Sequence, residues 1–199
     1  MPHPMRWAAL AAAGALAAVT ATVTLSDRAE AGRPLARAVL HDAAGTRLGT
    51  VTFTGTGHHA DRVDVDLDLP ADAPNPDSYH GLHVHAVGEC TPPFTTAGGH
   101  WNLDPHATHG HHTGDLASVL VQPDGRVSAR SETHRFDVDQ LFDADGSAVI
   151  LHVDADNFGN VPIAPDRYAD PNGWYDAPGG TAATGDAGGR YGCGVVERR

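Results

Sequence analysis

Hydrophobic and polar residues alternate at every second position in several short stretches of the chain. From Val63 to Leu69, valines and leucines alternate with three aspartates, which predicts a strand with one face in a core and the other in water. Residues 36–41 and 48–53 are two further short stretches, separated by the turn-forming Ala43-Ala44-Gly45. Residues 148–153 form a continuous apolar run, which is typical of a strand covered on both faces.

Turn signals separate these stretches. Residues 116–121 and 127–131 flank Pro123-Asp124-Gly125, which predicts a hairpin. Only residues 137–142 favour a helical turn, and residues 157–190 are rich in glycine, proline and aspartate with little pattern. Short strands joined by turns favour an all-β fold, an antiparallel sandwich or barrel. Long loops on such scaffolds are usually functional.

The first residues have the three parts of a secretory signal peptide. Arg6 precedes an apolar run over residues 7–23, and Ala29-Glu30-Ala31 provides a small-x-small cleavage site. The run is short for a membrane span, which needs about 20 strongly apolar residues, and its alanines and threonines make it less apolar. An uncleaved membrane anchor is the alternative interpretation. We expect residues 1–31 to be a signal peptide and residues 32–199 to be the mature domain, secreted or kept in the cell envelope with no stable membrane span.

Composition narrows the class of protein. The chain has 199 residues, of which 41% are hydrophobic and 19% charged, a globular balance that suits one sizeable domain. It contains no lysine, and its 13 arginines face 25 acidic residues, which gives a formal net charge of −12. A protein that binds nucleic acid needs a basic surface to displace counterions from phosphates. The sequence therefore excludes nucleic acid as a partner.

The two cysteines, Cys90 and Cys193, are interpreted together. In an exported chain an even number of cysteines indicates a disulfide, whereas cytosolic cysteines are more often reduced or catalytic. A bond between these two would join a histidine-rich loop to the last predicted strand.

Histidine is the over-represented residue, with 14 in the chain and eight of them in one short stretch. His83 and His85 are at positions i and i+2, so a strand would place both imidazoles on one face. Imidazole suits copper and zinc. His100 follows a Gly-Gly turn, and residues 109–115 add further imidazoles and an aspartate, the donor types of a zinc site. His152 lies in a predicted strand, where a buried core histidine is the alternative to a ligand.

Five motifs follow one another along the mature chain: GLHVHAVGEC (81–90), GGHWN (98–102), HGHHTGD (109–115), LHVDADNFGN (151–160) and GDAGGRYGCGVV (185–196). Together they resemble the copper,zinc superoxide dismutases, in particular the exported bacterial type. The resemblance implies a Greek-key arrangement of the predicted strands. It also implies an enzyme that converts superoxide to oxygen and hydrogen peroxide by alternate reduction and oxidation of a bound copper.

The resemblance further implies a role for each matching residue. The copper ligands would be His83, His85, His100 and His152, and the zinc ligands would be His100, His109, His112 and Asp115. His100 would bridge the two metals and supply a proton to the product. Asp156 would hydrogen-bond one histidine of each metal site, and Arg190 would guide superoxide to copper. Cys90 and Cys193 would form the family's disulfide within one subunit.

Two alternatives stay open at this point. Within the zinc loop, His106 is the alternative to His109, whereas His111 points away from its neighbour His112 in an extended segment. A non-catalytic copper- or zinc-binding module of the same fold is the alternative to an enzyme. The presence of every copper ligand together with Arg190 favours the enzyme.

The family resemblance leaves the surroundings of the site less defined. Members of the family usually place lysines near the channel to attract the anion over a long range, and this chain has no lysine. Trp174 and Tyr175, in the loop before Arg190, are better suited to covering a core or a partner surface than to catalysis. A homodimer is a possible state, and the sequence identifies no dimer face.

Overall fold

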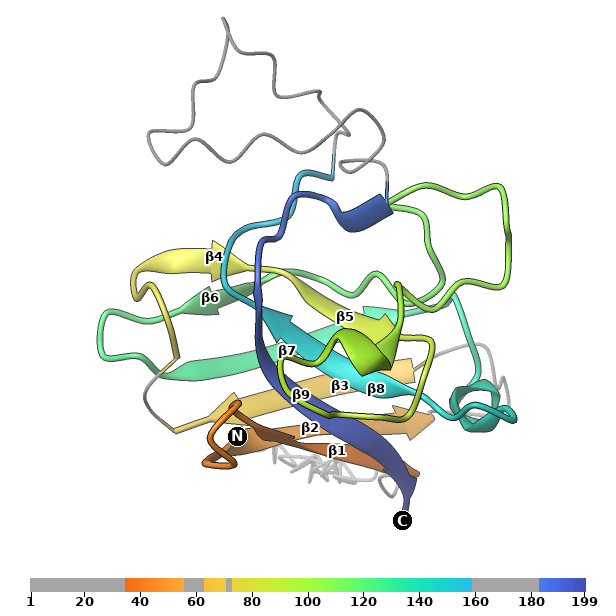
Figure 1. Cartoon of the computed structure of the whole chain (residues 1–199), viewed down its shortest axis with the longest axis horizontal. Helices are drawn as coiled ribbons and strands as arrows, with labels where there is room; N and C mark the ends of the chain where they lie inside the picture. The colour runs from red at the N-terminus through yellow and green to blue at the C-terminus, as the bar shows by residue number, and fades with distance from the viewer. Residues whose placement is uncertain (1–34, 56–62, 71–72, 159–182) are drawn as a thin grey trace, which may run out of the picture. The chain divides into compact units, whose positions relative to one another are not determined.

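The computed structural model describes residues 35–55, 63–70, 73–158 and 183–199 (Figure 1). The chain divides into two units, Met1–Ala31 and Gly32–Arg199, and all the described residues belong to the second. The predicted signal peptide, Trp174 and Tyr175 lie outside the described residues. No helix among the described residues has the length and apolarity needed to cross a membrane.

Short strands dominate the described part of the chain, as the alternation predicts. They are β1 (Ala36–His41), β2 (Arg47–Gly55), β3 (Val63–Leu69), β4 (Ser78–His80), β5 (Leu82–His85), β6 (Val119–Val121), β7 (Val127–Thr133), β8 (Ala148–His152) and β9 (Arg190–Arg198). Two short 3-10 helices, η2 (Thr95–Ala97) and η3 (Val138–Phe142), lie in the connections. The predicted helical turn at residues 137–142 is therefore confirmed, with Asp137 as its capping residue.

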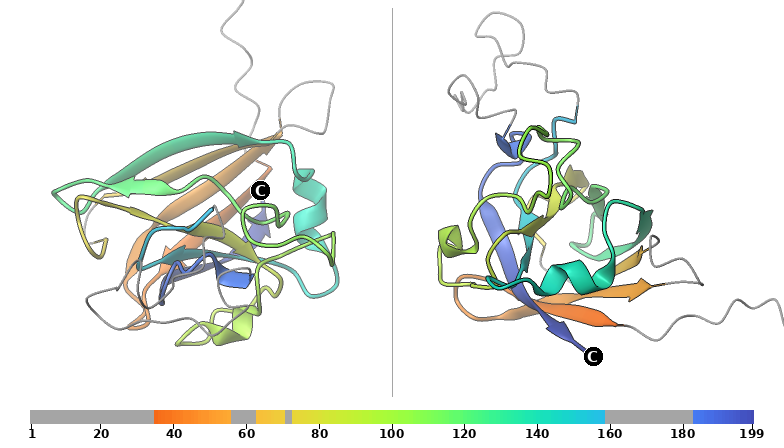
Figure 2. Two further views of the ribbon diagram at one scale, coloured as in Figure 1. Left: turned by 90° about the horizontal axis from the view of Figure 1, so that it is seen from above. Right: turned by 90° about the vertical axis from the view of Figure 1, so that its right-hand side faces the viewer.

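The strands form one seven-stranded sheet in the order β5-β8-β9-β1-β2-β3-β7 and a two-stranded sheet of β4 and β6. The neighbouring strands pair antiparallel. The last strand lies beside the first, and the large sheet curls around the core (Figures 1 and 2). The all-β, antiparallel Greek-key fold is confirmed.

Two predicted strand pairs have different outcomes. β1 and β2 pair as expected, around a turn in which the Gly45 amide donates to the Asp42 carbonyl at 3.0 Å. Gly45 has a positive φ of 84°, which only glycine adopts without strain. The predicted turn before β7 is also present, with the Gly125 amide 2.9 Å from the Gln122 carbonyl.

The predicted hairpin beyond that second turn is wrong. β6 pairs with β4, and β7 pairs with β3 along all seven of its residues. After the turn the two strands join different sheets, β6 the small sheet and β7 the large one. The turn can be predicted from its own residues, whereas the strand with which each neighbour pairs depends on the whole fold.

The core lies inside the curled sheet and supports the histidine-rich region. β3 buries Val63, Val65, Leu67 and Leu69 on one side, as its alternation predicts. β8 is buried at all five positions, which confirms the strand covered on both faces. Trp101 packs edge-on against Phe136 with ring centroids 5.5 Å apart, and this contact anchors the loop that carries His100.

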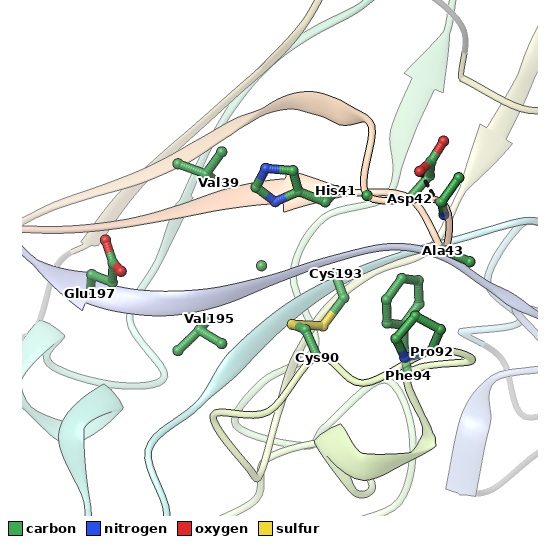
Figure 3. Close-up of a pocket in the computed structure, with 13 residues that line it drawn as sticks. Val39, His41, Asp42, Ala43, Cys90, Pro92, Phe94, Cys193, Val195 and Glu197 are labelled. Carbon is green, nitrogen blue, oxygen red and sulfur yellow. Dashed lines mark hydrogen bonds between the residues drawn. A yellow bond between two sulfur atoms is a disulfide. The ribbon is translucent and has the colours of Figure 1, made fainter.

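The disulfide joins Cys90, in the loop after β5, to Cys193 in β9. The two residues are 103 positions apart in sequence, and their Cα atoms are 5.7 Å apart. Ile150 and Phe94 pack in the small apolar cluster that contains this bond. A groove of about 700 Å³ runs along the outer side of the bond, between β1, β9 and the loop (Figure 3). The disulfide predicted from the cysteine count is confirmed.

We predict that replacing both cysteines, Cys90→Ser with Cys193→Ser, lowers the Tm by about 10 °C. Closing a loop of this length stabilises a fold by about 4–5 kcal/mol at most, and 1 kcal/mol shifts the Tm of a domain of this size by about 2–4 °C. Calorimetry of the parent and the double variant measures the shift. As a control, a reductant should lower the Tm of the parent and leave that of the double variant unchanged; equal Tm values for the two proteins would contradict the prediction.

Candidate metal centre

The first two histidines of the candidate site lie on β5. His83 and His85 are both buried, and the pleat of the strand directs their side chains to the same face. His152 ends β8, the neighbouring strand, at a shift in register between Leu151 and His152. In that register His152 lies opposite Arg190, the first residue of β9. Three adjacent strands thus bring these four residues together.

The other edge of β5 pairs with loop residues instead of a strand. The Val84 amide donates to the Gly114 carbonyl, and the Trp101 amide donates to the Val84 carbonyl, each at 2.8 Å. These bonds place His100 opposite His85 and Asp115 opposite His83 in isolated bridges. A Cβ atom on Gly114 would lie 2.3 Å from the Val84 carbonyl oxygen, so the close approach requires glycine there.

The first cluster consists of ring nitrogens that lie within 4.8 Å of one another. Its members are His83, His85, His100 and His152. The Nε2 atoms of His85 and His152 are 3.4 Å apart. The structure thus gathers all four residues that the resemblance assigns to copper.

Two rings of this cluster use their Nδ1 atom for an outer contact. The Nδ1 atom of His85 bonds the Gly98 carbonyl at 2.9 Å, and the Nδ1 atom of His152 bonds the Gly188 carbonyl at 3.2 Å. The Nδ1 atom of His83 is buried and has no hydrogen-bond partner among the described residues. The other nitrogen of each ring is left for a metal ion, since a ligating histidine normally bonds an oxygen on its far side.

The second cluster surrounds one carboxylate oxygen. The Oδ1 atom of Asp115 lies 2.8 Å from Nδ1 of His100, 3.4 Å from Nδ1 of His109 and 3.5 Å from Nδ1 of His112. The Nδ1 atom of His112 is buried and has no hydrogen-bond partner within the described residues. Three nitrogens and one oxygen are a donor set typical of tetrahedral zinc.

His83 is also close to the second cluster: His83, His100, His109 and Asp115 form a group with ligand atoms within 4.8 Å of one another. The Nε2 atom of His83, however, bonds Oδ1 of Asp156 at 2.8 Å. Its other nitrogen, Nδ1, is therefore the atom it can offer to a metal, and that atom belongs with the first cluster.

Asp156 connects the two clusters from behind. Besides its contact with His83, its Oδ1 atom lies 3.4 Å from Nε2 of His109. Its second oxygen accepts a hydrogen bond from the Ser118 hydroxyl at 3.0 Å. One buried carboxylate thus orients a histidine of each cluster, which is the arrangement that the resemblance implies.

The environment keeps the imidazoles of His83, His85 and His152 uncharged. Burial, with smaller repulsions from neighbouring rings, places the pKa of His83 and of His85 well below 6.5, and burial lowers the pKa of His152 to about 3. Burial alone would raise the pKa of Asp115, but hydrogen bonds from His100 and His109 bring it well below its usual range. Neutral imidazoles and an ionised carboxylate are the protonation states that bind metal ions.

Arg190 stands beside the first cluster. Its Nη1 atom donates to the Phe94 carbonyl at 2.5 Å, and its Nη2 atom donates to the Gly98 carbonyl at 2.6 Å. Gly98 is the same carbonyl that His85 contacts. Partial burial lowers the pKa of Arg190 from its usual value, but arginine stays protonated in proteins. The side chain therefore presents a fixed positive charge at the edge of the histidine cluster.

The structure separates the ambiguous histidines. His109 and His112 are buried within the second cluster, whereas His106 and His111 are exposed. One contributor escapes sequence reasoning, because no motif of the sequence singles out His80. His80 is fully buried, and its Nδ1 atom bonds the His152 carbonyl at 2.9 Å. Its position two residues before Leu82 gives no local signal for this long-range contact.

Comparison with known proteins identifies the class. A sequence profile described as copper/zinc superoxide dismutase matches residues 47–196, and the chain belongs to this family. It is 36% identical over 163 residues to a Cu-Zn superoxide dismutase of Mycobacterium tuberculosis, a match that covers 76% of this chain. It is 32% identical over 182 residues to the Cu-Zn superoxide dismutase of Mycolicibacterium paratuberculosis, covering 86% of this chain and 78% of that protein.

The chain covers part of the length of one relative, and it resembles a solved structure at low sequence identity. The chain spans 65% of the length of the M. tuberculosis protein. A solved structure of a SOD-like protein from Bacillus subtilis superposes with a TM-score of 0.59 at 23% identity, covering 80% of this chain and 96% of that one. At this identity the likeness shows the fold alone.

We predict that His109→Ala and His112→Ala each release zinc, because each removes a nitrogen within 3.5 Å of the Asp115 carboxylate oxygen. The matched controls are His106→Ala and His111→Ala, which alter exposed rings of the same loop and should keep zinc. Elemental analysis after dialysis gives the zinc content of the four variants. Loss of zinc from the His106 variant with retention in the His109 variant would reverse the assignment.

Proposed function

We propose that the chain is an exported superoxide dismutase that converts superoxide to oxygen and hydrogen peroxide. The copper ligands are His83, His85, His100 and His152, and the zinc ligands are His100, His109, His112 and Asp115. The observation that carries the proposal is that His100 belongs to the group of four histidines and also has its Nδ1 atom 2.8 Å from the Asp115 carboxylate of the second cluster. An imidazole shared by the two sites would suit a centre that couples electron transfer at one metal to proton transfer.

The residues fit both metals. Buried nitrogens of His83 and His112 have no hydrogen-bond partner among the described residues, and burying such groups costs free energy unless something binds them. Four imidazoles suit copper, and three imidazoles with one carboxylate suit zinc. When bound, copper supplies one-electron redox chemistry, and zinc supplies a fixed charge without redox chemistry of its own.

The chain's own residues attract the substrate and manage its protons. Superoxide is a small anion, and Arg190 offers a permanent positive charge with a planar pair of donors beside the first cluster. His100 has its Nδ1 atom directed to Asp115 at 2.8 Å, which leaves Nε2 as the atom that carries a proton to the product. Asp156 orients His83 and His109, so both clusters keep their geometry through the reaction.

The alternative is a non-catalytic copper- or zinc-binding module. Such a module has no need for an arginine beside the copper cluster, and Arg190 is present, opposite His152 in the sheet register. A dismutation assay on metal-loaded protein of residues 32–199, with copper and zinc measured in the same sample, separates the two. Full metal content without turnover would establish the binding module.

The remaining features are proposed on the sequence. Residues 1–31 are a signal peptide that is removed on export, and residues 32–199 are the dismutase domain, in the cell envelope or outside the cell. The disulfide between Cys90 and Cys193 agrees with an oxidising compartment. A homodimer stays a prediction.

We predict that Arg190→Ala lowers kcat/KM for superoxide about tenfold to a hundredfold, while both metals stay bound. The expected loss corresponds to one hydrogen bond to a charged group, about 1.5–3 kcal/mol. Arg198→Ala is the matched control, since Arg198 lies at the other end of β9 and its side chain bonds Asp139. Unchanged kcat/KM in a fully metallated Arg190 variant would refute the role.

We predict that Asp156→Ala weakens the binding of both metals about 10- to 100-fold, the usual effect of removing a carboxylate that orients metal-ligating histidines. Titration of the variant and the parent against a chelator measures both affinities. Ser118→Ala, which removes only the hydroxyl donor to Asp156, is the milder comparison. Affinities equal to those of the parent would count against Asp156 as the link between the clusters.

A further inference from the structure

Arg135 contacts the zinc loop although it lies well outside it in sequence. The residue follows β7 by two positions, and its side chain reaches across to the segment 110–115. Its Nη1 atom donates to the carbonyl oxygen of His112 at 2.8 Å and to that of Asp115 at 3.3 Å. Its Nη2 atom donates to the carbonyl oxygen of Gly110 at 2.8 Å. One guanidinium thus spans the whole segment.

These carbonyl groups belong to the ligands themselves or to a direct neighbour of one. His112 and Asp115 are two of the proposed zinc ligands, and Gly110 follows the third, His109. A single side chain therefore fixes the backbone at or next to every zinc ligand that the loop supplies.

The loop needs an external support because it contains no helix or strand of its own between Trp101 and Asp115. On its inner side, the Oδ2 atom of Asp115 accepts hydrogen bonds from the amides of Gly110 at 2.7 Å and His112 at 3.0 Å. On its outer side, Arg135 bonds the carbonyl groups of the same residues. A carboxylate inside and a guanidinium outside restrain one short segment from both faces.

The Arg135 side chain contributes little to the packing of the described part of the protein outside this loop. Arg135 is exposed, and the bonds of its guanidinium within the described part of the chain go to this loop. Its neighbour Phe136, by contrast, is buried in the core. Replacing the guanidinium should therefore leave the core packing intact.

We propose that Arg135 is a positioning residue that preorganises the zinc ligands of this loop. The inference rests on the proposed function, because it takes His109, His112 and Asp115 as the zinc ligands. A planar guanidinium presents several donors in a fixed fork and reaches separate acceptors together, whereas a lysine ammonium is a point charge on a flexible stem. Without the fork, the loop keeps only its inner hydrogen bonds, so metal binding must supply more of its order, which weakens binding.

The test compares Arg135→Gln and Arg135→Lys with the parent holoprotein. Zinc release into a chelator gives the off-rate, and the visible spectrum of Co²⁺ substituted at the zinc site reports the ligand geometry. Arg130→Gln is the matched control, since Arg130 is an exposed arginine of β7 whose ion pairs with Asp64 and Asp66, at 3.0 and 3.7 Å, involve β3 instead.

We expect both Arg135 variants to release zinc about tenfold faster or more, to show an altered Co²⁺ spectrum, and to keep copper and the Tm of the metal-free protein. Arg130→Gln should match the parent. Zinc release at the parental rate in both Arg135 variants, or full rescue by lysine, would overturn the proposal. These readouts do not require turnover: a parent that binds zinc without dismutating superoxide would refute the proposed function and leave the role of Arg135 testable.

Discussion

The metal centre depends on β5 being hydrogen-bonded along both edges. β8 pairs with one edge, and the loops around His100 and Asp115 pair with the other through the amide and carbonyl groups of Val84. A strand alternates its side chains strictly, so this double pairing fixes which face His83 and His85 present. Three further ligands follow from it, because His100 and Asp115 lie opposite residues of β5 and His152 lies on the strand next to it. The loop segments around His100 and Asp115 therefore take the place of a neighbouring strand at this edge of β5.

The second constraint is electrostatic. Six imidazoles and two carboxylates occupy a largely buried volume, and burial of unpaired polar groups is costly. The protein offsets part of this cost by giving three of the rings an oxygen partner: Asp156 for His83, the Gly98 carbonyl for His85, and the Gly188 carbonyl for His152. The other nitrogens of these rings lie close to the remaining ligand atoms of the site, where they can bind metal ions. Metal binding and folding are consequently linked, since the ions complete a polar core that the chain leaves partly unsatisfied.

The sequence predicts the local features of this protein well. The alternation in β3, the buried run of β8, the turn between β1 and β2 and the paired histidines of β5 depend on neighbouring residues alone. The family resemblance adds the histidines that the structure brings together. The pairing of β6 with β4 is not predictable in this way, because the turn before β7 does not determine which sheet each strand joins. His80 and Arg135 are missed for the same reason: each acts on a backbone carbonyl far away in sequence.

The Gly98 carbonyl oxygen has a consequence for the evolution of this site. It accepts hydrogen bonds from both His85 and Arg190, so a histidine of the copper cluster and the arginine beside it share one acceptor. The oxygen has two lone pairs and accepts both bonds at once, but each donor withdraws electron density from it, so each bond weakens the other. The free energies of substitutions at positions 85 and 190 should therefore not be additive. The cost of a substitution at one of these positions therefore depends on the residue at the other, which links the two in evolution.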